Sequence, residues 1–363
     1  MNGYGNSVFL RTAFEVSSGV APVNTVAPAI TGTAQEGETV TCSTGTWTGT
    51  PTITYAYQWK RNGSNIGSAT SSTYVLVTAD VSQSITCQVT ATNGFGSASA
   101  TSNTITPIAA VDPDAQAFIT AAAITDPTQQ AAINTLVVDL KGYSIWSKMK
   151  AIYPIVGSTA SQQKFNLKDP RDLDAAFRLQ FLGGWTHSAN GALPNGTNGY
   201  ADTFFNQTTN FTSTSNASIG VYLRTNNAST GADMGAGDTG ISRQGMLIYS
   251  SFTGVYYACA MGDTFIAPAP NNADSRGFYS VVRNAGVQSL HKRGNITLNV
   301  SETEAVGTIT NETIWVGGGT SGGYSFSSRE TAFNFIGDAL TETEINNFYT
   351  AVQAFQTTLG RNV

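Results

Sequence analysis

The most constraining feature of the sequence is a tryptophan that lies between two cysteines, each in a short stretch of alternating apolar and polar residues. The three residues are Cys42, Trp59 and Cys87, and the turn signal Asn62-Gly63 separates two of the stretches. Alternation with a period of two predicts β-strands with one buried face. The order Cys, Trp, Cys fits three strands of a two-sheet β-sandwich, with Trp59 packed on the cysteines between the sheets.

Residues 22–108 also resemble the immunoglobulin-like domains of bacterial and phage proteins. The resemblance implies a two-sheet sandwich with Cys42, Trp59 and Cys87 in its core. The cysteines are either bridged or two buried thiols, and the sequence leaves both alternatives open. The motifs that carry the likeness are Gly45-Thr46-Trp47, Tyr57-Gln58-Trp59, Thr73-Tyr74-Val75-Leu76, Thr78-Ala79-Asp80-Val81 and Val89-Thr90-Ala91-Thr92-Asn93-Gly94.

The composition narrows the class of protein. Charged residues make up only 11% of the 363 residues, and the formal net charge is −5. With so few cations there is no basic surface to neutralise phosphates, so nucleic-acid binding is not expected. No apolar run approaches the roughly 18 to 20 residues of a membrane-spanning helix, so membrane insertion is not expected either. Two histidines and three cysteines are too few for a Cys/His zinc site.

Residues 1–21 differ in character from the rest of the chain. We interpret them as an N-terminal arm that docks on a partner, because its apolar residues exceed what a solvated tail needs; the alternative is a frayed terminus. The start lacks the cationic and apolar regions of a secretory signal, so we expect a chain made in the cytoplasm that either stays there or leaves by a route that reads no N-terminal signal. The arm's apolar residues are Val8, Phe9, Leu10 and Phe14.

Residues 109–165 are the only long internal segment with helical character. Asp126-Pro127 predicts a helix start, because Asp is a good N-cap and Pro suits the first helical position. We interpret this segment as a helical connector that braces the domain after it; the alternative is an oligomerisation seam. Apolar residues then recur at helical spacing: Ile133, Leu136, Val137 and Leu140.

Residues 166–363 return to short strands separated by loops rich in Asn, Gly, Ser and Thr. No second Cys, Trp, Cys pattern occurs here, which favours one large jelly roll. The sequence Thr341-Glu342-Thr343-Glu344 is a capping box and predicts a C-terminal helix. The fold class is therefore mainly β: an immunoglobulin-like sandwich, a short helical segment and a larger jelly roll that ends in a helix.

The end of the chain resembles the last part of a concanavalin-like (laminin G-like) jelly roll. This likeness rests on Ile314-Trp315-Val316-Gly317-Gly318-Gly319 and Phe333-Asn334-Phe335-Ile336-Gly337-Asp338. Residues 112–363 also resemble C-terminal regions of bacteriophage virion and tail proteins, on motifs such as Phe165-Asn166-Leu167-Lys168-Asp169-Pro170-Arg171-Asp172. The resemblance implies a virion component and no specific activity.

The distribution of carboxylates bears on catalysis, because some concanavalin-like jelly rolls hydrolyse glycans. Retaining hydrolysis needs two carboxyl groups on one cleft, usually alternating along a strand. None of the predicted strands carries such a pair. We therefore predict that the chain is not an enzyme and that it needs no cofactor.

Glycan binding needs only neutral polar loops and aromatic rings, and one segment offers both. Residues 183–202 predict one long Gly- and Asn-rich loop, and long irregular loops are commonly functional. The alternative is a loop that closes the core or packs on a neighbouring subunit. Candidate Ca²⁺ ligands lie near Gly-rich turns: Asp233, Asp238 and Asp263. The candidate glycan-binding residues are Trp185, His187, Asn195, Tyr200 and Asp202.

These observations predict a structural protein of the bacteriophage virion surface, as a capsid decoration or a head or tail fibre. Its jelly roll would adhere to host or environmental glycans, and its arm would bind other capsid or tail proteins. A homo-oligomer is expected, because many copies convert weak contacts into avidity. The first alternative is a purely structural virion protein whose jelly roll contacts neighbouring subunits. A glycan-degrading enzyme is the second, and the missing carboxylate pair argues against it.

Overall fold

The structure is a computed structural model of the chain. It describes residues 19–213, 215–227, 229–236, 245–252, 255–262, 272, 274–293, 298–303, 309, 311–319 and 325–363. The chain divides into two compact units: unit 1 ends at Ala110 and unit 2 begins at Val111. The predicted docking residues Val8, Phe9, Leu10 and Phe14 lie outside the described residues. The expectation of a mainly β fold is confirmed.

Unit 1 is built from short antiparallel strands. One sheet has the order β2-β3-β7, a second has the order β6-β5-β8-β9, and β1 pairs with β4. The identity of this unit as an immunoglobulin-like domain stays a prediction. The strands are β1 (Val23–Val26), β2 (Ile30–Thr31), β3 (Thr39–Cys42), β4 (Thr46–Thr48), β5 (Thr54–Arg61), β6 (Ser64–Asn65), β7 (Thr73–Val75), β8 (Ile85–Asn93) and β9 (Gly96–Thr101).

The core of unit 1 brings the Cys, Trp, Cys residues together. Trp59 on β5 is fully buried and lies directly opposite Cys87 on β8. Cys42 and Cys87 are both buried, free thiols. A hydrogen bond between them lowers the pKa of Cys42 and raises that of Cys87. The indole N–H of Trp59 donates to the carbonyl of Ser71 at 2.9 Å, so the ring is held between the sheets.

Unit 2 contains two large antiparallel sheets. The eight-stranded sheet has the order β12-β13-β25-β15-β19-β20-β21, with β10 also paired to β25. Its strands are β10 (Met149–Tyr153), β12 (Trp185–Ser188), β13 (Gly191–Pro194), β15 (Asn216–Leu223), β19 (Gly277–Asn284), β20 (Val287–Arg293), β21 (Leu298–Thr303) and β25 (Thr331–Gly337).

The second sheet of unit 2 has six strands in the order β11-β14-β22-β16-β17-β18, and a short pair β23-β24 stands beside it. An apolar core lies between the two large sheets, with Ile219 and Ile336 from one and Phe205 and Ile314 from the other. These strands are β11 (Gln180–Leu182), β14 (Tyr200–Asn206), β16 (Met234–Ala236), β17 (Gly245–Phe252), β18 (Val255–Gly262), β22 (Thr313–Val316), β23 (Gly318–Gly319) and β24 (Ser325–Phe326).

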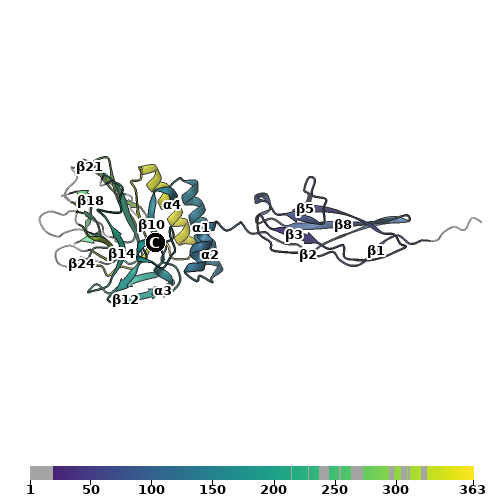
Figure 1. The fold of residues 1–363 in the computed structure, drawn as a ribbon, viewed down its shortest axis with the longest axis horizontal. Coiled ribbons are helices and arrows are strands. Elements are labelled where there is room, and N and C mark those ends of the chain that lie inside the picture. The colour runs from purple at the N-terminus through teal and green to yellow at the C-terminus, as the bar shows by residue number, and fades with distance from the viewer. Residues whose placement is uncertain are drawn as a thin grey trace, which may run out of the picture. The chain divides into compact units, whose positions relative to one another are not determined.

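Helices cover the other face of the eight-stranded sheet and make a third layer. Phe278 and Phe335 of the sheet join one apolar cluster with residues of α1, α2 and α4. Figure 1 shows these three helices side by side at one flank of unit 2. The helices are α1 (Pro113–Ala121), α2 (Pro127–Gly142), α3 (Ala160–Gln163) and α4 (Glu342–Thr358). Among the described residues, no helix is long and apolar enough to cross a membrane.

The segment that we interpreted as a helical connector and brace, residues 109–165, belongs to unit 2 from Val111 onward. Within this segment β10 pairs along β25 as a strand of the large sheet, with Ile152 opposite Phe335. The apolar face of α2 is buried against α4 and the sheet, because a helix with this stripe gains more by covering phenylalanines than by facing water.

Candidate functional site

The segment predicted as one long loop is mostly regular structure. β12 and β13 form a hairpin in which Trp185 lies opposite Pro194 and Ser188 opposite Gly191. β14 then begins after a short turn, and its residue Tyr200 lies opposite Leu182 of β11. The prediction of an irregular loop over residues 183–202 is therefore wrong, because strand pairing satisfies the backbone groups of most of it.

Asn195 organises the turn that remains. Its Oδ1 atom accepts the backbone N–H groups of Thr197, Asn198 and Gly199, each at 3.0 Å. Its Nδ2 donates to Asn198 Oδ1 at 2.8 Å. The amide of Asn195 is thus used to shape the backbone, as Asn commonly does in turns.

Trp185 is also held by the protein. Its indole N–H donates to the carbonyls of Leu182 at 3.0 Å and Tyr200 at 3.1 Å. The ring packs over Gly317, whose φ is 75°; a Cβ there would lie only 2.7 Å from the ring. The indole is therefore part of the scaffold that fixes the start of β14.

His187 lies next to Trp185 in the same hairpin. Its Nδ1 atom is 2.6 Å from Gln163 Oε1, and its ring meets the ring of Phe181 edge-on at 4.6 Å between centroids. Burial lowers the pKa of His187, which favours the neutral imidazole. The side chain is half-buried and already bonded, so it supports the hairpin.

Tyr200 lies on the outward face of the six-stranded sheet and stacks on a residue that was not predicted. On β14 the side chains alternate, with Ala201 and Phe205 buried and Tyr200 and Asp202 partly exposed. On β22, Ile314 and Val316 are buried and Trp315 faces outward. The ring centroids of Tyr200 and Trp315 are 3.9 Å apart, with 23° between the planes.

Asp202 completes this outward surface. It lies directly opposite Trp315 across the β14–β22 pair and opposite Gln180 across the β11–β14 pair. One carboxylate oxygen accepts the backbone N–H of Phe204 at 2.8 Å. We call Tyr200, Asp202 and Trp315 the aromatic patch. Sequence reasoning missed Trp315, although the alternation of Ile314 and Val316 already placed it on the opposite face of its strand.

The metal candidates do not form a site among the described residues. Asp233 is fully buried, and its carboxylate is occupied by Arg329 at 3.0 Å, the hydroxyl of Ser327 and the backbone N–H of Ser250. This ion pair contradicts the proposed Ca²⁺ role of Asp233, because a buried arginine already supplies the positive charge. Asp238 and Asp263 lie outside the described residues. Across the part of the chain that the structure describes, no cluster of three His, Cys, Asp or Glu side chains occurs.

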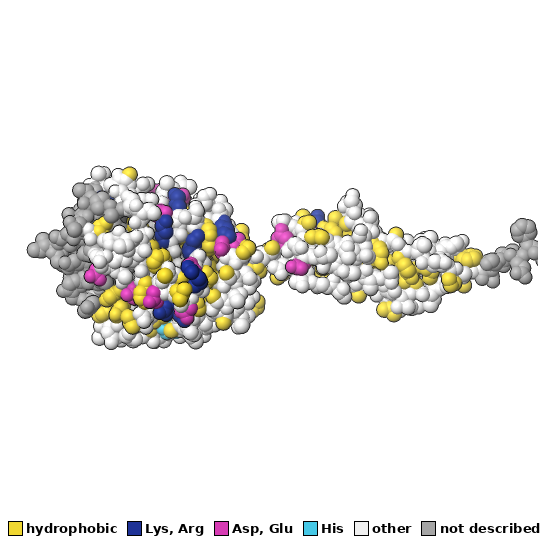
Figure 2. Space-filling view, in the orientation of Figure 1, with side chains coloured by type: hydrophobic (Ala, Val, Ile, Leu, Met, Phe, Trp, Pro, Cys, Tyr) yellow, Lys and Arg dark blue, Asp and Glu magenta, His cyan; other side chains and the backbone are white. Residues whose placement is uncertain are grey.

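Charged side chains gather on unit 2, where both signs are interspersed, whereas unit 1 shows few of them (Figure 2). The pairs include Lys150 with Asp338 at 3.1 Å and Lys148 with Glu344 at 2.6 Å. Interspersed charges of this kind make no uniform field over the face that Figure 2 shows.

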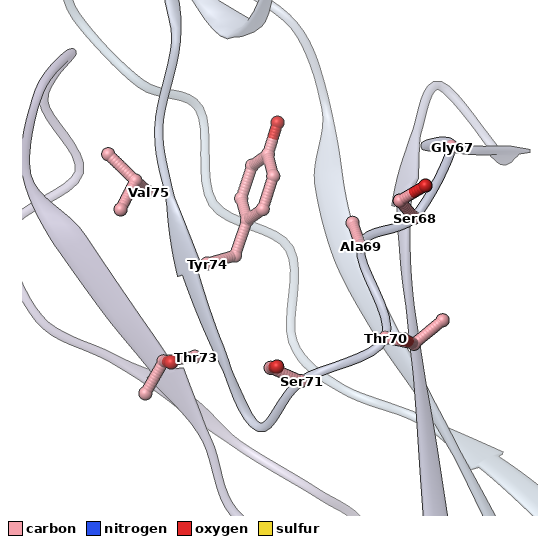
Figure 3. A pocket seen from close by; sticks show the side chains of 8 residues that line it. All are labelled: Gly67, Ser68, Ala69, Thr70, Ser71, Thr73, Tyr74 and Val75. Carbon is pink, nitrogen blue, oxygen red and sulfur yellow. The ribbon is translucent and has the colours of Figure 1, made fainter.

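Unit 1 has a shallow pocket of about 290 Å³ between β7 and residues 67–71. Small side chains surround it, and Tyr74 is its one aromatic residue (Figure 3). The hydroxyl of Tyr74 donates to buried Asp80 at 2.9 Å, and its ring stacks on Trp59. Tyr74 is therefore engaged with the core of unit 1.

Comparison with known proteins finds distant structural likenesses. No protein-family model matches the chain, and no curated protein matches it. Among solved structures, Trypanosoma rangeli sialidase in complex with sialic acid is 7% identical, with a TM-score of 0.40 over 73% of this chain and 42% of that one. Ruminococcus gnavus IT-sialidase CBM40 bound to α2,3-sialyllactose is 14% identical, with a TM-score of 0.28 over 36% of this chain and 80% of that one. The chain thus spans less than half the length of the sialidase.

These structures correct one prediction. We expected that the chain is not an enzyme, yet the structures that it partly resembles include sialidases, which are enzymes. At these TM-scores and identities the likeness carries no argument for an activity or a ligand of this chain.

Proposed function

We propose that the chain is a bacteriophage virion-surface protein, a capsid decoration or a head or tail fibre, that displays unit 2 for adhesion to glycans. The observation that carries the glycan-binding part is the stack of Tyr200 on Trp315 at the outward face of the six-stranded sheet. Both rings are only partly buried, and they stand on rigid, paired strands.

The chemistry of the aromatic patch suits a sugar. Sugar rings present apolar C–H groups on one face and hydroxyl groups at the rim, so they pack on aromatic faces and need acceptors beside them. Tyr200 and Trp315 supply the aromatic surface. The carboxylate of Asp202 is the acceptor for a hydroxyl group, since one of its oxygens is bonded to the backbone of Phe204 and the carboxylate has further lone pairs.

The other candidates have a supporting role in this proposal. Trp185 donates its indole N–H to the carbonyl of Tyr200, and Asn195 shapes the turn before it. His187 fixes the hairpin through Gln163. They position the strand that carries Tyr200 rather than contact the ligand.

The virion part of the proposal rests on the sequence resemblance of residues 112–363 to phage virion and tail proteins. Residues 1–21 would attach the chain to other capsid or tail proteins, and a homo-oligomer would multiply weak contacts into avidity. Imaging the intact particle by cryo-electron microscopy tests this placement. Residues 1–21 seated on a neighbouring virion protein support it, and their absence from any such contact overturns the docking role.

Binding is tested with the full chain on a glycan array that includes host-surface polysaccharides. We expect Tyr200→Ala and Trp315→Ala each to weaken binding at least tenfold, which corresponds to about 1.4 kcal/mol of lost contact. Tyr143→Ala is the matched control, because Tyr143 is an exposed aromatic residue of unit 2 that lies at the end of α2.

Two outcomes would contradict the glycan-binding proposal. Binding that survives both aromatic substitutions would place the ligand elsewhere. No binding to any glycan would favour the structural alternative, in which unit 2 contacts neighbouring virion subunits. Release of soluble sugars from the bound polysaccharide is measured in the same experiment, because catalysis is not excluded.

A further inference from the structure

A second pocket lies in unit 2, on the face of the eight-stranded sheet that the helices only partly cover. Its volume is about 310 Å³. It is bounded by β19, β20 and β21 and by the residues at the start of α4. The residues that line it are Val282, Asn284, Val287, Ser289, His291, Ser301, Leu340, Thr341 and Glu342.

Strand register explains the floor of this pocket. Val282 lies opposite Ser289, and Ser289 lies opposite Ser301, so three neighbouring strands present these side chains in one row. Further in, the same sheet face carries Phe278 and Phe335, which pack against Phe348 of α4. On this face β20 and β21 thus carry the hydroxyl groups of Ser289 and Ser301, whereas β19 and β25 carry phenylalanines. The floor of the pocket is therefore polar, and the sheet surface beside it is apolar.

His291 is the side chain that points to a ligand. It lines the pocket, yet it is only 3% exposed, and no described residue makes a hydrogen bond with its Nδ1 atom. Buried polar atoms are nearly always bonded, so an unpaired ring nitrogen in a pocket wall calls for an explanation. Burial, together with the nearby Arg293, lowers the pKa of His291 to about 4, so the ring is neutral near pH 7.

The chain contains a matched comparison. His187 is the other histidine of the sequence. Its Nδ1 atom is 2.6 Å from Gln163 Oε1, so this nitrogen is satisfied within the protein. The two histidines therefore differ in the property that matters here: one has an internal partner at Nδ1 and the other does not.

The lining favours an uncharged, polyhydroxylated ligand. Ser289 and Ser301 share a hydrogen bond of 2.9 Å, and each retains capacity for another. Val282, Val287 and Leu340 add an apolar wall for C–H groups. A free anion is disfavoured, because the nearby cation Arg293 is already paired with Glu342 of the lining at 3.3 Å.

We propose that this pocket binds one ring of a neutral sugar, with a sugar hydroxyl group hydrogen-bonded to Nδ1 of His291. This inference is independent of the proposed adhesion site, because the aromatic patch lies on the other sheet. It gives unit 2 two sites for the same ligand class, one on an outward aromatic surface and one in a polar pocket at the start of α4.

The test records the NMR signals of both histidine rings in the full chain, with ¹⁵N in the imidazole groups. Glucose, galactose, mannose and N-acetylglucosamine are titrated separately to tens of millimolar. We expect at least one sugar to shift the His291 ring signals in a saturable manner while the His187 signals stay in place. Ser301→Ala should weaken that binding about fivefold, as the loss of one hydrogen bond does.

Variants separate this site from the aromatic patch. Trp315→Ala should leave the His291 shift unchanged, whatever it does on the glycan array. Three results would overturn the inference: no saturable His291 shift with any of the four sugars, equal shifts of both histidines, or a His291 shift with inorganic phosphate in place of the sugars. The loss of one set of ring signals in His291→Asn assigns that set to His291. If His291→Asn fails to fold, the weaker sugar binding of Ser301→Ala is the measurement that tests the proposal.

Discussion

At the scale of single residues, His291 links the pocket to stability. Its imidazole is almost fully buried on β20, next to Arg293 on the same strand and near Glu342 at the start of α4. Burial disfavours the charged form first, and the positive charge of Arg293 adds to the effect. The pKa of His291 in the folded chain is about 4, below the ordinary value of 6.5.

This depressed pKa predicts a defined pH dependence of the unfolding free energy. Between about pH 6.5 and pH 4 the unfolded chain binds the proton and the folded chain does not, so stability is lost as the pH falls through that window. The slope approaches about 1.4 kcal/mol per pH unit for this one group. Above pH 6.5 the contribution is complete and constant.

The measurement is urea unfolding of the wild type and of His291→Gln from pH 7.5 to pH 4.5. The difference in unfolding free energy between the two proteins reports on His291 alone, because the carboxylates and His187 titrate in both. We expect this difference to shrink steadily below pH 6.5. A difference that is flat with pH would mean that His291 is protonated as easily in the folded chain as in the unfolded one.

At the scale of elements, the two sheets of unit 1 meet at Cys42 and Cys87. Oxidation of these thiols would tie β3 to β8 and reduce the entropy of the unfolded chain. For a loop of this length we expect about 4 kcal/mol of added stability in the chain-entropy model. The transition of unit 1 should therefore move to higher temperature in oxidised protein and return when dithiothreitol is added.

Cys42→Ala is the control for this prediction, because it removes the bridge and leaves Cys87 as a single buried thiol. Its unfolding should be the same with and without reductant. If the wild type also behaves alike in both conditions, the two sulfur atoms do not form a bond in the folded unit.

The elements differ in how far the sequence predicts them. The capping box at Thr341 predicted the start of α4: the Glu344 carboxylate accepts the backbone N–H of Thr341 at 2.8 Å, and the Thr341 hydroxyl accepts the backbone N–H of Glu344 at 3.3 Å. The alternation of apolar and polar residues predicted the strands around Trp59, because each of these strands has one buried face and one solvent-exposed face. It could not assign β15 or β25 to layers, because both faces of these strands are buried and their apolar residues do not alternate.

The candidate surface was predicted only in part. Tyr200 and Asp202 were found from aromatic and acidic residues in a Gly-rich segment. Trp185 and Asn195 were predicted as glycan-binding residues from the same sequence pattern. In the structure their polar groups make hydrogen bonds to the nearby backbone. Trp315 was missed because its stacking partner is more than a hundred residues away in sequence, and the β14–β22 pairing that joins them is a tertiary contact.

At the scale of the whole molecule, the two units have separate cores. The core of unit 1 gathers around Trp59, and the cores of unit 2 lie on either side of its large sheet. We expect two calorimetric transitions for the chain. Fragments 1–110 and 111–363 should each melt within a few degrees of the matching transition. A single transition that is lost in both fragments would show that the units stabilise each other.

The helical layer of unit 2 has a consequence for the order of synthesis. One face of the eight-stranded sheet is covered by α2, which leaves the ribosome before the strands of this sheet, and by α4, which leaves after the last of them, β25. Until α4 emerges, Phe278, Phe333 and Phe335 lack part of their cover, and paired strands with exposed phenylalanines favour aggregation. A nascent or truncated chain that lacks α4 is therefore the form that would need a chaperone, even though every strand is already present.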